Sequence, residues 1–202
     1  MKIIGITGGV GSGKTQILTY IEEHYSARII LADKVAHFLQ EPGQVCFEPL
    51  KTLLGHAIID GDGFIDKSKM AQMIFANKEL LEQVNEIVHP AVQTYIEEQI
   101  LFEKEQKKIE FLFIEAALLI EAGYERVVDE LWYIWADEKT RMQRLKNARN
   151  YSEEKTERIM RQQLQDVEFR NHCSFVIDNS GSLDETYLQI DEKLGEYLCR
   201  NK

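Results

Sequence analysis

The sequence lacks any apolar run of the roughly 20 residues that a membrane-spanning helix requires. The short apolar stretch at the N-terminus also lacks the length of a signal-peptide core. Only three cysteines occur, and they are far apart, without the spacing of metal ligands: Cys46, Cys173 and Cys199. We therefore expect reduced thiols, no disulfide framework, no membrane association and a cytoplasmic location.

Positive charge is scarce as well. The 202 residues include 34 acidic and 24 basic side chains, which gives a formal net charge of −10. A nucleic-acid-binding protein usually carries a dominant basic stripe, and the absence of one excludes a nucleic-acid partner from our expectations. A polyanionic ligand would have to be attracted by a local positive site, because the overall charge repels it.

Strand-like and helix-like segments alternate along the chain, which predicts an α/β fold with a mostly parallel sheet. The strand-like segments lie at residues 2–7, 27–31, 111–114, 131–135 and 175–177. Two long segments between them have helical spacing: residues 44–108, with Pro90 at a helix start or kink, and residues 138–168. We expect one domain with its core at about 1–40, 109–137 and 173–202, an insert at 41–108 and a lid at 138–172.

Residues 8–15, GGVGSGKT, match the phosphate-binding pattern G-x-x-x-x-G-K-[ST]. Glycines allow backbone N–H groups to converge on an anion, and the following helix adds the partial positive charge of its N-terminus. Lys14 would reach the β- and γ-phosphates of ATP, and the Thr15 hydroxyl would bind Mg²⁺. The motif follows an apolar strand and begins a helical pattern, which is the context that a nucleotide-binding loop requires.

Two acidic residues follow predicted strands. Asp33 lies just beyond the second strand, at the edge where α/β proteins bind ligands, and could orient the proton of an attacking hydroxyl. Glu115 follows the strand at 111–114, where a carboxylate can hold the water shell of Mg²⁺. For each residue, a capping or purely structural role is about as good an interpretation.

The arginines of one charged segment and one histidine are weaker candidates for functional residues. A kinase needs mobile cations to clamp the transferring phosphoryl group, although most arginines of a charged segment only form a solvated helix face. His89, before Pro90, is better explained as a polar residue at a helix boundary than as a ligand contact. The arginines in the charged segment are Arg141, Arg144, Arg149, Arg158, Arg161 and Arg170.

A GTP-dependent switch is disfavoured because no N-K-x-D tetrad, which reads guanine, occurs in the sequence. The run DGDG at residues 60–63 satisfies D-x-x-G, but it fails as a calcium loop. An EF-hand needs glycine at its sixth position and glutamate at its twelfth, where this chain has Ile65 and Ala71. We interpret the run as a surface turn.

Taken in order along nearly the whole chain, the motifs resemble those of the dephospho-coenzyme A kinases. The shared segments are IGITGGVGSGKT, Asp33 within LADKVA, Pro42-Gly43, DGDGFIDKSKM with Phe75, His89-Pro90, LLIEAG at 118–123, Arg144-Leu145, Arg158-Ile159 with Gln162, and VIDN at 176–179. The resemblance implies transfer of the γ-phosphoryl group of ATP, with Mg²⁺, to the ribose 3′-hydroxyl of dephospho-coenzyme A. It also implies a three-layer P-loop kinase core with a five-stranded parallel sheet, a helical acceptor-binding insert and a helical lid.

The resemblance further implies roles for individual residues. It assigns catalysis to Lys14, Asp33, Arg144 and Arg149, and nucleotide binding to Gly11, Ser12, Gly13, Lys14, Thr15 and Gln16. It assigns acceptor binding to Thr7, Asp33, His89, Pro90 and Leu118, and the metal to Thr15 and Glu115.

This sequence departs from the family pattern at several of these positions. Glu115 and Ala117 stand where the family often has aspartate and proline, and Ile120 replaces a phenylalanine. Ala148 occupies the usual place of the second lid arginine, and Arg149 comes one residue later. On a helix that shift rotates the side chain by roughly 100°.

Two other functions stay open on the sequence alone. One is a small-molecule kinase of the same architecture acting on a nucleoside monophosphate or a sugar acid. The other is a nucleotide-binding regulatory protein without a small-molecule acceptor. The sequence does not determine the oligomeric state.

Overall fold

The computed structural model describes residues 1–116, 119–120, 123–149 and 151–200. The chain divides into two compact units: the core unit, Met1–Ile29 with Lys107–Lys202, and the insert unit, Ile30–Gln106. The chain therefore leaves the core unit once and returns to it once.

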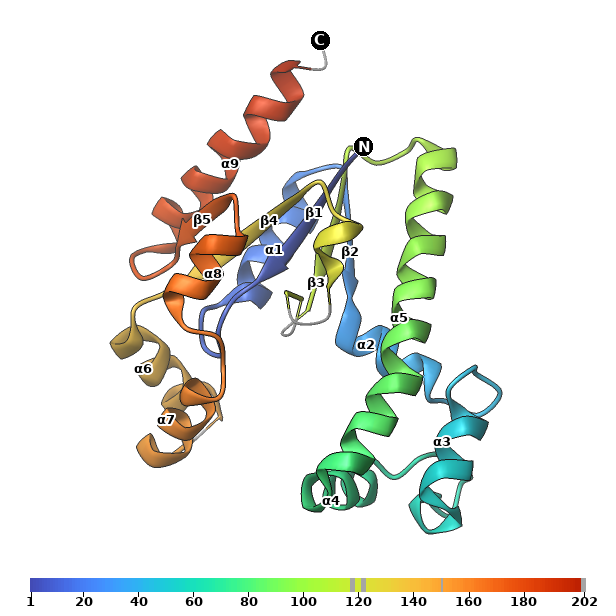
Figure 1. Ribbon diagram of the computed structural model, residues 1–202. Coiled ribbons are helices and arrows are strands. Elements are labelled where there is room, and N and C mark those ends of the chain that lie inside the picture. Colours follow the sequence, from blue (N-terminus) through green and yellow to red (C-terminus); the bar gives the residue numbers. More distant parts are fainter. Residues whose placement is uncertain (117–118, 121–122, 150, 201–202) are drawn as a thin grey trace. The chain divides into compact units, whose positions relative to one another are not determined.

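A five-stranded sheet organises the core, with strand order β2-β3-β1-β4-β5 (Figure 1). β1 pairs in parallel with both β3 and β4, and β4 pairs in parallel with β5. The predicted parallel sheet is thus confirmed. The strands are β1 (Lys2–Thr7), β2 (Ala27–Leu31), β3 (Phe111–Glu115), β4 (Glu130–Trp135) and β5 (Phe175–Asp178).

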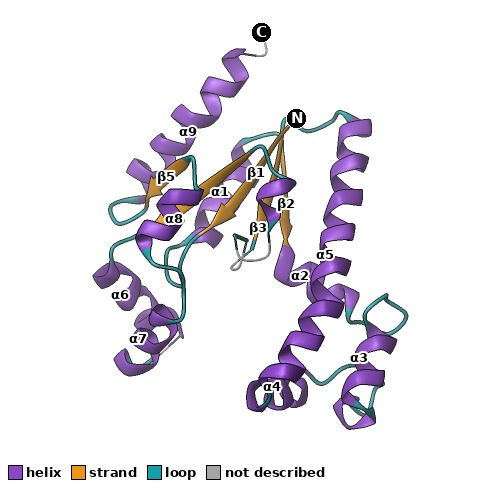
Figure 2. Cartoon of the chain, viewed as in Figure 1, coloured by secondary structure: helices purple, strands orange, loops and turns teal. Residues whose placement is uncertain are grey.

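Helices pack on both faces of this sheet, because alternate side chains of the buried strands point to opposite faces (Figure 2). On one face, the ring of Phe111 contacts Tyr25, at the end of α1, and Tyr197 of α9. On the other face, Tyr133 of β4 stacks on Phe169 of α8 with ring centroids 4.6 Å apart. This is the three-layer arrangement predicted. The helices of the core unit are α1 (Lys14–His24), η2 (Tyr124–Arg126), α6 (Glu138–Arg149), α7 (Glu153–Arg161), α8 (Asp166–His172) and α9 (Leu183–Arg200).

The insert unit is helical: α2 (Ala32–Leu39), α3 (Phe47–Leu54), η1 (His56–Ile58), α4 (Lys67–Ala76) and α5 (Lys78–Gln106). Of the two alternatives predicted at Pro90, a helix start or a kink, the helix start is wrong, because α5 runs through this residue without ending. A helix-interior proline costs about 3 kcal/mol. Burial of an apolar side chain contributes about 1.5–3 kcal/mol, and α5 buries a stripe that continues on both sides of Pro90. The stripe consists of Val84, Val88, Val92, Ile96 and Ile100.

The run at residues 60–63 forms the surface turn that the sequence predicts. One carboxylate oxygen of Asp60 accepts hydrogen bonds from the backbone N–H groups of Asp62 and Phe64, at 3.0 and 2.9 Å. Gly63 adopts a φ of 88°, which favours glycine. Within the described residues, no helix is both long and apolar enough to cross a membrane.

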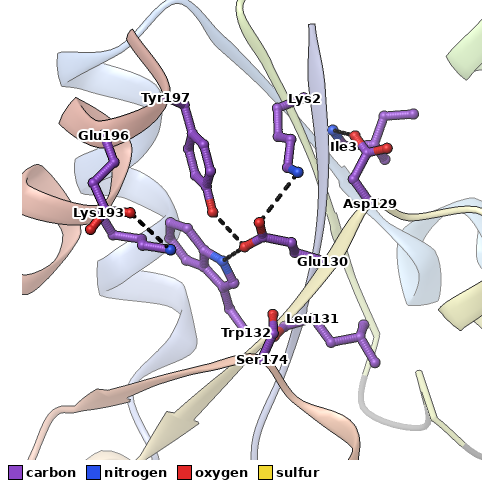
Figure 3. Close-up of polar contacts among 10 residues, drawn as sticks. All are labelled: Lys2, Ile3, Asp129, Glu130, Leu131, Trp132, Ser174, Lys193, Glu196 and Tyr197. Carbon is purple, nitrogen blue, oxygen red and sulfur yellow. Dashed lines mark hydrogen bonds and ion pairs between the residues drawn. The ribbon is translucent and has the colours of Figure 1, made fainter. Parts of the chain in front are cut away.

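At the amino ends of the strands, a polar network joins β1, β4 and α9 (Figure 3). The Glu130 carboxylate pairs with the Lys2 ammonium at 3.2 Å and accepts a hydrogen bond from the Tyr197 hydroxyl. The indole N–H of Trp132 donates to the same carboxylate at 3.4 Å. Burial raises the pKa of Glu130, but the hydrogen bonds from Tyr197, Lys2 and Trp132 together outweigh burial and lower it below its ordinary value.

Candidate functional site

The loop between β1 and α1 turns so tightly that its glycines have little room for side chains. Gly13, the N-cap of α1, has a φ of 91°, a conformation that favours glycine. A Cβ atom on Gly13 would overlap the side-chain amide of Asn179, and a Cβ atom on Gly9 would overlap the guanidinium of Arg141. The packing around the loop therefore requires the glycine-rich sequence.

Lys14 is held over the start of this loop. Its ammonium group donates to the carbonyl oxygen of Gly8 at 2.6 Å and lies 3.8 Å from the Glu115 carboxylate. Glu115 reaches this position because β3 lies beside β1, so that the carboxyl ends of both strands meet at one edge of the sheet. Only 15% of each side chain is exposed. A fixed cation and a carboxylate thus lie together where the sequence predicts phosphate and metal binding.

Two buried hydroxyl groups beside the loop have no hydrogen-bond partner among the described residues: Oγ1 of Thr7 and Oγ of Ser12. A buried polar group without a partner costs roughly 1–3 kcal/mol. A phosphate oxygen would supply the missing acceptor for a hydroxyl in the loop. The uncompensated hydroxyl of Ser12 therefore fits a loop built to receive an anion.

The first turn of α1 presents Thr15 and Gln16, whose side chains are exposed. Among the described residues, no group of three or more His, Cys, Asp or Glu side chains could hold a metal ion. Mg²⁺ in nucleotide sites usually keeps several waters and is held by one or two protein oxygens and the substrate phosphates. One hydroxyl, on Thr15, and one carboxylate, on Glu115, suit that kind of site.

Arg141 of α6 and Gln163, just beyond α7, bind both backbone polar groups of Val10. Nε of Arg141 donates to the carbonyl oxygen of Val10 at 2.9 Å. The side-chain oxygen of Gln163 accepts from the backbone N–H of Val10 at 2.9 Å and from Nη2 of Arg141 at 3.1 Å. Burial lowers the pKa of Arg141. The three residues form a closed ring of hydrogen bonds at the tip of the loop.

A second set of contacts holds the loop at Ser12. The side-chain amide of Asn179 donates to the carbonyl oxygen of Ser12 at 2.7 Å, and Nη1 of Arg144 donates to the same oxygen at 3.3 Å. Nη2 of Arg144 also donates to the carbonyl oxygen of Asn179 at 2.8 Å. The fully buried Asn179 is itself fixed, because its side-chain oxygen accepts from the Thr186 hydroxyl at 3.0 Å.

The predicted site residues fall into three groups. The core unit brings together Thr7, Gly11, Ser12, Gly13, Lys14, Thr15, Gln16, Glu115 and Arg144. The insert unit carries Asp33, in the first turn of α2 directly after β2, and the neighbouring His89 and Pro90 on α5; all three side chains are exposed. Leu118 lies outside the described residues, as does the side chain of Arg149, the last residue of α6.

The sequence did not predict the contacts of three residues with the loop: Arg141, named only among the six arginines of the charged segment, Gln163 and Asn179. Arg141 and Arg144 are three residues apart, a spacing that puts both on one face of a helix and that could have identified Arg141. Gln163 follows Gln162, the glutamine named in the family pattern, which is exposed at the C-cap of α7. Asn179 stands in the quoted VIDN segment, but no local signal relates it to a loop 167 residues away.

Known proteins resemble this chain along nearly its whole length. A family model described as dephospho-CoA kinase matches residues 2–185. A dephospho-CoA kinase of Streptococcus agalactiae serotype Ia is 35% identical over 195 residues, covering 96% of this chain and 97% of that protein.

Two solved structures share the fold along nearly the whole chain. TT1252 from Thermus thermophilus has a TM-score of 0.77 at 27% identity, with 96% of this chain and 97% of that chain covered. The dephospho-CoA kinase from Campylobacter jejuni has a TM-score of 0.74 at 21% identity, with both chains fully covered, and this likeness concerns the fold alone. The family predicted from the ordered motifs is confirmed by the family model and by the sequence relatives: the chain belongs to the dephospho-CoA kinase family.

Proposed function

We propose that this protein transfers the γ-phosphoryl group of ATP to the ribose 3′-hydroxyl of dephospho-coenzyme A, giving coenzyme A and ADP. The observation that carries the proposal is the phosphate-binding loop with its fixed Lys14, in a chain that the family model matches over residues 2–185. The reaction is the last step of coenzyme A synthesis.

On the nucleotide side, the backbone N–H groups of the loop and the Lys14 ammonium bind the phosphates. Ser12 supplies a buried hydroxyl without a partner in the described structure, which supports its assignment to the phosphates. Gln16 follows in the first turn of α1, where the partial positive charge of the helix N-terminus adds to the attraction. Phosphoryl transfer needs mainly positioning and electrostatic stabilisation, and this loop contributes both.

Mg²⁺ accompanies the nucleotide in this proposal. Thr15 and Glu115 would hold it, the first through its hydroxyl and the second directly or through bound water. The ion would supply positive charge that offsets the negative charge of the phosphates. Glutamate, one methylene longer than the aspartate that is usual in the family, retains the carboxylate that this role needs.

On the acceptor side, Asp33 accepts or orients the proton of the attacking hydroxyl. Its place in the first turn of α2, directly after a strand of the sheet, supports this role, because ligands of open α/β sheets bind beyond the carboxyl ends of the strands. His89 and Pro90, with Thr7 and Leu118, hold the acceptor, and Arg149 belongs to the closing lid together with Arg144. These assignments are transferred from the family by position.

An acceptor assay tests the proposal. Purified protein with ATP and Mg²⁺ is given dephospho-coenzyme A, and ADP and coenzyme A are measured. Shikimate, a sugar acid and nucleoside monophosphates serve as matched acceptors. Turnover with dephospho-coenzyme A alone is expected; turnover only with another acceptor, or ADP formation that does not depend on any acceptor, would refute the assignment.

A cytoplasmic location and the absence of a nucleic-acid partner complete the proposal. Cell fractionation tests the first, and retention on a nucleic-acid column at physiological salt tests the second. Recovery in the membrane fraction or salt-resistant retention would contradict them.

A further inference from the structure

Two arginines of α6 bind carbonyl oxygens of the phosphate-binding loop. Arg141 donates to Val10, and Arg144 donates to Ser12. The two arginines are three residues apart on one helix. α6 therefore presents both guanidinium groups to the loop from the same side. Each guanidinium group donates its N–H groups to oxygen atoms of the protein.

The contacts fix the direction of two peptide groups. In a planar trans peptide, the carbonyl of one residue and the N–H of the next point in opposite directions. Holding the carbonyl of Val10 toward α6 therefore turns the N–H of Gly11 away from it, and holding the carbonyl of Ser12 turns the N–H of Gly13 away likewise. Gly11 and Gly13 both belong to the segment that the phosphate-binding motif assigns to phosphate.

Gln163 completes the arrangement at Val10. Its single side-chain oxygen accepts from the backbone N–H of Val10 and from the Arg141 guanidinium, so it binds the loop and orients the arginine at once. Gln163 carries no charge, and the oxygen that it uses here is an acceptor, which does not bind a phosphate oxygen. Through these two contacts Gln163 affects phosphate binding by way of the geometry of the loop and of Arg141.

We infer that Arg141 and Gln163 are positioning residues that orient the loop amides toward the nucleotide phosphates, so that α6 and the end of α7 set the affinity for the phosphate chain. The inference rests on the proposed function only insofar as the loop binds ATP; it does not depend on the acceptor. It also gives Arg141 a role other than contact with the transferring phosphoryl group.

Binding of ADP and of AMP to variants provides the test, with dissociation constants measured by calorimetry or NMR. Arg141→Met and Gln163→Met should each weaken ADP binding up to about tenfold, because each removes a hydrogen bond that orients the loop. AMP lacks the β-phosphate and should bind nearly as before. Because both residues hold Val10, the double variant should lose little more than either single variant, far less than the product of the two losses.

Arg161→Met is the matched control. Arg161 is 79% exposed on α7 and pairs only with Glu157 in the contacts described, so its loss should leave both affinities unchanged. If Arg141→Met does not fold, Arg141→Lys, which keeps the charge and one donor, should give an intermediate loss of ADP binding. Thermal unfolding of every variant is recorded alongside.

Three results would overturn the inference. Equal weakening of ADP and AMP would indicate general damage. Loss of kcat with unchanged ADP binding would make Arg141 a direct transition-state contact. A Gln163→Met variant with normal ADP affinity would show that Arg141 acts through its own charge. If the variants lose ADP affinity as expected but the native protein fails the acceptor assay, the proposed reaction is refuted and the inference about Arg141 and Gln163 stands.

Discussion

The ammonium group of Lys14 and the carboxylate of Glu115 lie 3.8 Å apart at the carboxyl ends of two neighbouring strands, β1 and β3. In the proposed function, this pair puts a metal-binding group beside a phosphate-binding group. Glu115→Gln should raise the Mg²⁺ concentration needed for half-maximal rate by about 10-fold or more, as groups that hold metal-bound water typically do. Magnesium titrations of the steady-state rate measure this directly.

Glu115→Asp is the matched control, since it restores the residue usual in the family. It should keep the Mg²⁺ requirement within a few-fold of the native enzyme. If Glu115→Gln leaves that requirement unchanged, Glu115 serves only to hold Lys14. Removal of Mg²⁺ by a chelator should abolish turnover in all three proteins.

Replacement of Lys14 should affect the chemical step most. Lys14→Met removes the cation that the proposed function assigns to the transferring phosphoryl group and should lower kcat by about 10²–10³-fold, the usual loss for one preorganised stabilising group. Single-turnover measurements at saturating ATP separate this loss from weaker binding. A variant with native kcat and only a raised KM would limit Lys14 to ground-state binding.

Asp33→Asn tests the proposed handling of the acceptor hydroxyl. The amide keeps the size of the side chain but cannot take up a proton, so turnover should fall about 10²–10⁴-fold. ADP affinity should stay near native, since Asp33 is assigned to the acceptor. An unchanged kcat would remove Asp33 from the mechanism.

Two glycines of the loop should respond differently to alanine. In Gly9→Ala the new methyl group meets the end of the flexible Arg141 side chain, which can move away. The variant should fold normally and lose ADP affinity to about the same extent as Arg141→Met. The double variant Gly9→Ala with Arg141→Met should bind ADP no more weakly than either single variant, because each substitution already removes the contact of Arg141 with the loop.

Gly13→Ala should be the more damaging change. Its φ of 91° is strained for alanine, at roughly 1–2 kcal/mol, and the methyl group meets the buried amide of Asn179. For a protein of this size, about 2 kcal/mol corresponds to a fall of roughly 4–8 °C in the unfolding midpoint. Calorimetric unfolding of both glycine variants would reveal the contrast, and equal midpoints would contradict the packing argument.

The Glu130 network should make stability depend on pH in acid. Its hydrogen bonds hold the pKa of the folded carboxyl below the ordinary value, so the unfolded chain takes up the proton first as the pH falls. The stabilisation is present above the ordinary glutamate pKa, near 4.3, and is lost as the pH falls through the lower pKa of the folded state. Glu130→Gln should therefore flatten the dependence of unfolding free energy on pH below about 4.5.

At pH 7 the same variant should lose about 1 kcal/mol of stability, as expected for weakened hydrogen bonds to one group. ADP affinity should not change, since Glu130 is the first residue of β4, whereas the phosphate-binding loop follows the carboxyl end of the parallel strand β1. Denaturant unfolding at several pH values provides the measurement. A parallel shift of native and variant curves at all pH values would exclude the proposed titration.

Patterns among neighbouring residues correctly predicted the elements that depend mainly on those residues. The strand predicted at residues 2–7 agrees with β1 to the residue, and the glycine motif correctly predicted a helix, α1, after the loop. Both predictions rest on residues that are neighbours in the sequence. A helix start at Pro90, one of the two alternatives predicted there, is wrong because burial of an apolar stripe on α5 outweighs the local preference of proline. Burial depends on how segments distant in the sequence pack together. The spacing of apolar residues shows which face of a helix is buried, but not against which segment.

The contacts around the loop could be predicted only in part for a similar reason. Glycine, Lys14 and Thr15 lie within eight residues and share one motif. Gln163 is 153 residues from its partner Val10, and Arg141 is 131 residues from it. No spacing rule relates residues so far apart, and the resemblance to a family named the neighbouring Gln162 instead.

The central place of β1 in the sheet has a consequence for synthesis of the chain. β1 is made before the other four strands, yet its two neighbouring strands are β3 and β4, and Lys2 pairs with Phe111. The ribosome must therefore complete the entire insert unit before β1 can gain its first strand partner. Until then the apolar residues of β1 have no sheet to join and lack the neighbouring strands that bury them in the folded protein.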